Sequence, residues 1–217
     1  MPDPGDSRGP QRHNADLTSI HVGRAIAGDN ASLEWVVLRI TPLLLVQAEY
    51  RLGRALRRLH DPEDIVNDVW AAALPRLGSL IVENGRRVPA FVGYLSTSVL
   101  HRVQRLQQRW LQEKRAASRS GEATGAGLAA EIPADATSVV GRSVRNEHCV
   151  ELRRAIAQLD AKDSEIVILR GIEQHPAAAV AAVLGINDNA VNVRYHRALR
   201  RLIETVRDSV LVDFVDE

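Results

Sequence analysis

One helical stripe near the C-terminal end constrains the fold of this chain more than any other feature. Val191, Tyr195, Ala198 and Leu202 follow one another at offsets of four, seven and eleven residues, which puts their side chains on one face of an α-helix. The opposite face collects mostly polar and basic side chains, of the kinds that hydrogen-bond base edges or pair with phosphate oxygens. They are Asn189, Asn192, Val193, His196, Arg197 and Arg200. The pattern predicts a helix with one buried face and one face available to DNA.

A short apolar segment precedes this helix and turns sharply into it. Residues 177–184 repeat small apolar side chains at spacings of three and four, which lets two helices cross closely. Gly185 has no Cβ and can take the left-handed conformation that ends a helix, and Asp188 is the expected cap of the next helix. The two segments together predict a helix-turn-helix. The alternative is an ordinary helical hairpin with a solvated basic face.

Position along the second helix decides which of its side chains can reach bases. The N-terminal half of such a helix enters the major groove, and its later part leaves the groove near the phosphates. The side chains predicted to recognise bases are Asn192, His196 and Arg197. The side chains predicted to position the helix on the phosphate backbone are Arg194, Arg200 and Arg201.

Composition favours an all-α chain built from two small domains. The 217 residues include only 4% aromatic residues, and strand-forming runs are scarce. Such a composition suits helices that pack through aliphatic side chains. The net charge is +1, so affinity for nucleic acid must come from local clusters of basic residues. The single cysteine, Cys149, excludes an internal disulfide and a cysteine-rich zinc site, and we expect it to be buried.

The sequence suggests no enzymatic site. The seven histidines are scattered, and the chain has no Ser/His/Asp or Cys/His arrangement and no Gly-rich phosphate loop. We therefore expect no catalytic residue, no metal and no cofactor. No apolar run approaches the roughly 18 to 20 residues that cross a bilayer. Since the N-terminus also lacks the apolar core of a signal peptide, we expect no membrane insertion and a cytoplasmic location.

The segment Asp61-Pro62-Glu63-Asp64 carries strong signals for the start of a helix. Asp61 can cap the helix, Pro62 suits its first position, and the two following carboxylates favour the positive end of the helix dipole. Asp61, Asp64 and Asp68 then share one face. A metal site is the alternative to an acidic surface, but the segment has neither a histidine partner nor a calcium-binding loop. A long apolar helix, kinked at Pro42, is predicted before this segment.

The next long helix, predicted over residues 90–115, becomes basic in its second half. Its basic side chains are Arg102, Arg105, Arg109, Lys114 and Arg115. Tyr94 and Trp110 add flat aromatic faces, and aromatic side chains beside arginines suit unstacked bases as well as phosphates. The alternative for each aromatic residue is a core side chain on a solvated helix.

Changes in composition divide the chain into two domains. Residues 1–15 are rich in Pro, Gly and polar groups and are expected to be disordered, and residues 117–143 are rich in Gly and Ala and predict a flexible linker. The remaining parts are a first domain over residues 16–116, the helix-turn-helix domain over residues 144–210 and an acidic tail over residues 211–217.

Taken together, these segments resemble the extracytoplasmic-function sigma factors of bacterial RNA polymerase, in the sigma-70 superfamily. The resemblance spans residues 18–208, and its most specific parts are LGI-x4-V-x3-Y-x-RA-x3-L at residues 184–202 and DPEDIVND at residues 61–68. It implies a protein that binds core polymerase, recognises promoter DNA and helps to open it for transcription initiation. The implied partners are bacterial core RNA polymerase and promoter DNA. Whether an anti-sigma factor restrains the protein is left open.

The resemblance also implies roles for individual residues. The helix that begins at Asp61 would dock on the polymerase clamp, the segment from Tyr94 to Trp110 would meet and help to open the minus-ten element, and the helix-turn-helix would bind the minus-thirty-five element. The polymerase-binding residues would be Asp61, Glu63, Asp64, Asn67 and Asp68. The minus-ten residues would be Tyr94, Arg102, Arg105, Arg109 and Trp110. The helix-turn-helix residues would be Asn189, Asn192, Val193, Arg194, His196, Arg197, Arg200 and Arg201.

The chain departs from the family at a few positions. Gln174 stands where the turn usually has glycine, Pro176 stands at the usual Ser or Thr cap, and Tyr94-Leu95 replaces the usual Trp-Leu pair. The residues alone also leave a second function open, a dimeric helix-turn-helix regulator whose N-terminal helices form a sensor or dimerisation domain. Such a regulator would bind duplex DNA without polymerase.

Overall fold

The computed structural model describes residues 10–79, 87–120 and 139–206, and every regular element in these ranges is helical. The prediction of an all-α chain is therefore confirmed. The first domain contains α1 (Pro10–Ile26), α2 (Asn30–Leu56), α3 (Pro62–Ala73), the 3-10 helix η1 (Leu74–Ser79) and α4 (Arg87–Ser120). The later helices are α5 (Val139–Ala157), α6 (Ala161–Ile166), the π-helix η3 (Val167–Ile172), α7 (Ala177–Leu184) and α8 (Asp188–Thr205).

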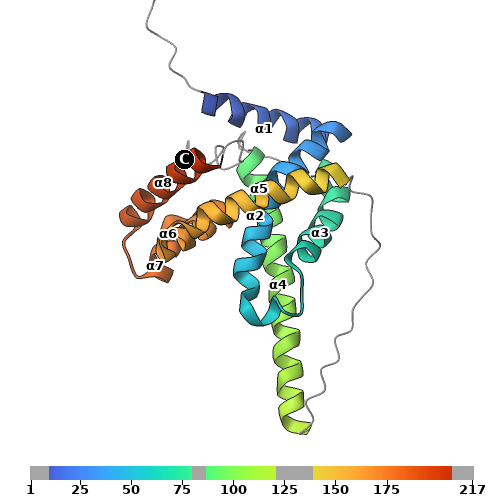
Figure 1. Ribbon diagram of the computed structural model, residues 1–217, viewed down its shortest axis with the longest axis vertical. Coiled ribbons are helices and arrows are strands. Elements are labelled where there is room, and N and C mark those ends of the chain that lie inside the picture. Colours follow the sequence, from blue (N-terminus) through green and yellow to red (C-terminus); the bar gives the residue numbers. More distant parts are fainter. Residues whose placement is uncertain (1–9, 80–86, 121–138, 207–217) are drawn as a thin grey trace, which may run out of the picture.

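Helix α2 is the centre of the first domain, with α1, α3 and α4 packed around it (Figure 1). Because helices surround it, residues 41–48 of α2 are all buried. Trp70 of α3 donates its indole N–H to the Thr41 hydroxyl at 3.0 Å, and its ring lies 6.1 Å from that of Phe91 in α4. These contacts tie three helices into one core.

Helix α2 is also long and apolar enough, by length and composition, to cross a membrane. The absence of such a segment, expected from the sequence, is therefore wrong by this test. However, 61% of its most apolar window is buried inside the protein, as expected for the core helix of a bundle. The sequence predicted a kink at Pro42. In the structure, the helical backbone angles of α2 are instead interrupted at Gly53, with φ 64° and ψ 177°.

Several helix boundaries follow local sequence signals. Asp61 caps α3 by accepting the N–H of Glu63 at 2.9 Å, and Gly185 ends α7 in the left-handed conformation with φ 65°. The predicted cap of α8 was wrong by one residue. Asn187 is the cap, because its side chain accepts the N–H of Ala190 at 2.7 Å, and Asp188 is the first helical residue.

Some of the residues expected outside the domains are helical. Helix α1 begins at Pro10, within the N-terminal segment expected to be disordered, while residues 1–9 lie outside the described ranges. Helix α4 extends to Ser120 and α5 begins at Val139, so both enter the predicted linker, whose residues 121–138 are not described. The acidic tail also lies outside the described residues.

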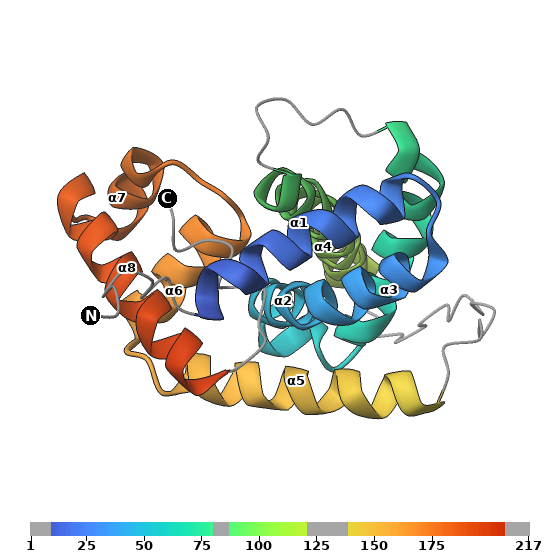
Figure 2. The same cartoon turned by 90° about the horizontal axis from the view of Figure 1, so that it is seen from above.

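The C-terminal helices pack against one another and against the first domain. The predicted stripe of α8 is buried, with Val191, Tyr195, Ala198 and Leu202 at most 1% exposed. Helix α5 runs alongside α2 and reaches α8 (Figure 2), and η3 contacts both α2 and α4. The C-terminal half of α4 projects beyond the other helices (Figure 1).

Candidate nucleic-acid interface

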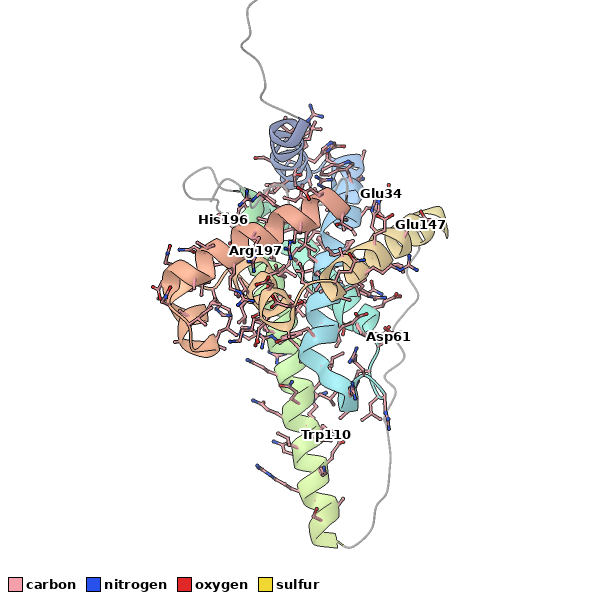
Figure 3. The ribbon with its side chains drawn as sticks, turned by 60° about the vertical axis from the view of Figure 1, so that its left-hand side comes forward. Glu34, Asp61, Trp110, Glu147, His196 and Arg197 are labelled. Carbon is pink, nitrogen blue, oxygen red and sulfur yellow. The ribbon has the colours of Figure 1, made fainter. Side chains whose placement is uncertain are left out.

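The face of α8 opposite the core presents the side chains predicted to read DNA. Asn189 and Val193 are exposed, and Asn192 and His196 are half-buried at the edge of the same face. Figure 3 shows His196 and Arg197 on the outer surface of this helix. The structure therefore brings the predicted set together on the first three turns of α8.

Two of the predicted arginines have acidic partners within their own domain. Arg194 donates from Nε to Asp163 at 2.6 Å and from a terminal nitrogen to Asp160 at 2.8 Å. Arg197 donates only one terminal nitrogen to Asp163, at 3.1 Å, and its side chain is 49% exposed. Arg194 thus braces α8 against the start of α6, whereas about half of the Arg197 side chain remains exposed to solvent.

One member of this acidic pair, Asp160, also caps α6. Asp160 accepts the backbone N–H of Asp163 at 2.9 Å, and this hydrogen bond lowers the pKa of Asp160 below its ordinary value of 3.8. The positive charge of Arg194 lowers the pKa of Asp160 further. The hydrogen bond to Asp163, in turn, raises the pKa of Arg194. The Asp160 carboxylate therefore both starts α6 and holds one of the arginines of α8.

Further along α8, Arg200 and Arg201 are exposed. Arg200 donates its Nε to the backbone oxygen of His196 at 3.3 Å, one turn earlier in the helix. Both arginines lie beyond the base-reading positions, where a recognition helix leaves the groove and meets phosphates.

The basic face of α4 lies on the part of the helix that projects from the bundle. Arg105 and Arg109 are exposed, while Arg102 pairs with Asp68 of α3. Trp110 is half-buried and has the Lys114 ammonium 5.0 Å from its ring centroid. Tyr94 is half-buried near the other end of the helix and packs against the core. The stacking and core interpretations of both aromatic residues remain predictions.

The acidic start of α3 is exposed. Glu63, Asp64 and Asn67 face solvent, Asp61 is engaged as the cap, and Asp68 is held by Arg102. Figure 3 places Asp61 well apart from His196 on α8. No group of three or more His, Cys, Asp or Glu side chains that could hold a metal ion occurs within the described ranges.

Comparison with known proteins shows which family the chain resembles. Residues 149–202, from the end of α5 to α8, match the family model for sigma-70, region 4. The chain is 29% identical over 188 residues to the ECF RNA polymerase sigma factor SigD of Mycobacterium tuberculosis, a match that covers 85% of this chain and 82% of SigD. The ECF RNA polymerase sigma factor ShbA of Streptomyces griseus is 29% identical over 185 residues, or 83% of this chain and 91% of ShbA. Over most of its length, this chain is therefore similar to extracytoplasmic-function sigma factors.

The resemblance expected from the sequence motifs is confirmed by these relatives. Sigma factors are transcription initiation factors without enzymatic activity. A solved chain, CnrH in complex with the cytosolic domain of CnrY, aligns with 87% of this chain and 96% of its own length at 22% identity. Its TM-score of 0.37 is too low to indicate one shared arrangement of helices, so the assignment depends on the sequence relatives.

A polar cluster lies where the two halves of the chain meet, and no sequence motif predicted it. Glu173, just after η3, lies against Gln47 and Arg51 of α2 and its side chain is 0% exposed. A weak signal was present in the sequence, since Gln47 interrupts the apolar run of α2 and Glu173 follows the apolar residues of η3. A polar side chain within a buried run needs a polar partner, but nothing local identifies that partner.

Proposed function

We propose that this sigma factor binds core RNA polymerase through the start of α3, engages the minus-ten element along α4 and reads the minus-thirty-five element with α8. The similarity to ECF RNA polymerase sigma factors across 85% of the chain carries the proposal. The protein would act with polymerase in the cytoplasm. It supplies no catalytic group and contributes binding and positioning.

The geometry of α8 supports a division of roles along the helix. Asn192, His196 and Arg197 would recognise bases, together with Asn189 and Val193 at the start of the helix. Arg200 and Arg201 would hold phosphates. Arg194, doubly paired with Asp160 and Asp163, would orient the helix in its domain and contact DNA less than the sequence analysis expected.

Along α4, the exposed Arg105 and Arg109 support contact with the backbone of the opened strand, and Trp110 could stack on an unpaired base. Arg102 would do less, because Asp68 already neutralises it. This pairing also means that, of the acidic residues after Asp61, Glu63 and Asp64 are better placed than Asp68 to meet polymerase.

A charge reversal tests the docking surface. Glu63→Lys combined with Asp64→Lys should weaken binding to core polymerase by about tenfold or more, because it replaces attraction by repulsion at the contact. Circular dichroism should show unchanged helix content, since both side chains are exposed. A matched control reverses Glu34 and Glu147, which are also exposed but lie apart from Asp61 at the start of α3 (Figure 3). Equal affinity of the test and control variants would remove α3 as the docking surface.

A further inference from the structure

One apolar side chain stands in the middle of the polar face of α8. Val193 is 58% exposed, whereas the other side chains predicted to face DNA on this helix all carry hydrogen-bonding groups. Val193 adds nothing to the buried stripe of α8, and its branched side chain is also a weak helix former. Neither the core nor the stability of the helix therefore accounts for a valine at this position.

Val193 points directly away from the core. Successive residues of an α-helix are rotated by about 100°, so Val193 lies about 160° around the helix from Val191 and from Tyr195. Both of these residues are buried. Asn189 and Arg197, four residues before and after Val193, are exposed and lie within about 40° of it around the helix. Val193 is thus the centre of the outward line of side chains.

Polar side chains flank this line on both sides. Asn192 and His196 are half-buried on one side. On the other side, Arg197 donates a terminal nitrogen to Asp163 of α6 at 3.1 Å. Figure 3 shows His196 and Arg197 on the outer surface of the helix. When this face enters the major groove, the residue at its centre comes closest to the base edges, and that residue is Val193.

The major groove offers a single kind of apolar group to a valine. Adenine, guanine and cytosine present ring nitrogens, a carbonyl oxygen or amino groups there, whereas thymine presents a C5-methyl group beside its carbonyl oxygen. A valine against the polar groups would displace their water without replacing the hydrogen bonds, which is unfavourable. A valine against the methyl group of thymine buries apolar surface on both partners, which is favourable.

We propose that Val193 reads the C5-methyl group of one thymine in the minus-thirty-five element. The contact rests on the proposed function of α8 and names the group on the DNA that this side chain recognises. It makes thymine the preferred base at one position, close to the positions that Asn192 and Arg197 read through hydrogen bonds. Because 5-methylcytosine carries a methyl group at the same place on its ring, the contact extends to that base.

Uracil separates the methyl group from the rest of thymine, because the two bases share the same hydrogen-bonding edge. Synthetic fragments carry the promoter selected by core polymerase with the wild-type protein, and each thymine of the minus-thirty-five element is replaced by uracil in turn. The measurement is the affinity of the complex of protein and core polymerase for each fragment. We expect one replacement to weaken binding by the wild-type complex about fourfold, the effect of one buried methyl group.

Val193→Ser removes the apolar surface from an exposed position, so the fold should be retained. We expect this variant to bind thymine and uracil at that position with equal affinity. Val183→Ser is the matched control, because Val183 is also an exposed valine, at 67%, but lies on α7. Val183→Ser should keep the fourfold difference. Arg197→Ala should keep it as well, because this change removes a hydrogen-bonding neighbour and leaves the valine in place.

5-Methylcytosine provides the converse test. Cytosine in place of the thymine that Val193 contacts should weaken binding, because both the methyl group and the hydrogen-bonding edge change. A methyl group at C5 of that cytosine should recover about fourfold in affinity for the wild-type complex. It should recover nothing for Val193→Ser.

Three results would overturn the contact. They are equal binding of all the uracil fragments by the wild-type complex, a selected minus-thirty-five element without thymine, and a loss on uracil replacement that persists in Val193→Ser. Each can occur while the complex still binds its selected promoter, and the proposed function then stands. If no form of the protein binds a two-part promoter with core polymerase, the proposed function fails and the contact with thymine falls with it.

Discussion

Pairing between charged side chains decides which arginines of α8 are available to DNA. Arg194 uses two of its nitrogens on Asp160 and Asp163, whereas Arg197 uses one. The periodicity of the helix placed both arginines near the groove and could not separate them, because their acidic partners are more than thirty positions earlier in the chain. The hydrogen bonds in the structure show that Arg194 is more fully paired than Arg197.

A comparison of two arginines tests the proposed docking of α8. Arg197→Ala should relax sequence preference at one base pair, since a base contact contributes about 1 to 3 kcal/mol of discrimination. Arg201→Ala should weaken binding to all sequences about equally, because a phosphate contact carries no base information. Selection of bound fragments by polymerase with each variant measures both effects. A changed consensus for Arg201→Ala together with an unchanged one for Arg197→Ala would show that the helix docks in another register.

Gln174 stands where the turn usually has glycine, and its backbone takes a conformation that glycine favours. Among the described residues other than glycine, Gln174 alone has a positive φ, of 57°. A left-handed conformation costs a side chain about 1 to 2 kcal/mol relative to glycine, which explains why glycine is usual at this turn. The Gln174 amide partly compensates by donating to the backbone oxygen of Gly171. The strained residue directly follows Glu173, whose buried carboxylate pairs with Arg51 of α2.

At the scale of helices, the sequence predicted those helix starts and ends that depend on a few neighbouring residues. The Asp61 cap with Pro62 after it and the left-handed Gly185 are confirmed, because each depends on chemistry within one turn. The cap of α8 was misplaced because Asn187 and Asp188 are both good capping residues. Val150 of α5 is 37% exposed although Leu152 and Ile156 of the same helix are buried, because the packing of α5 against α2 sets which of its faces is buried.

The projecting part of α4 is expected to act through charge. Replacing Arg105 and Arg109 with alanine should reduce the slope of log affinity against log salt concentration for promoter binding by roughly 1.4 to 1.8, at about 0.7 to 0.9 per phosphate contact. Trp110→Ala is the matched comparison. It should leave the slope unchanged and reduce strand opening, detected by permanganate reactivity of unpaired thymines. A salt slope that is the same with and without the arginines would place the DNA elsewhere.

At the scale of the whole molecule, the sequence indicated two helical domains but not their contact. Arg51 and Glu173 are 122 positions apart, and neither belongs to a motif. Hydrophobic periodicity identifies buried faces within each helix but does not show which helices of the other domain cover them. The composition of residues 117–143 predicted independent domains, whereas the described helices on either side pack together.

The most direct test of the central claim is selection from a library of random duplexes, with core RNA polymerase and this protein separately and together. A sigma factor should enrich two short blocks of preferred bases at a fixed separation of about 25 base pairs, and only when both components are present. Enrichment of a single palindromic site by the protein alone, with no further change on adding polymerase, would contradict the account and support a dimeric regulator.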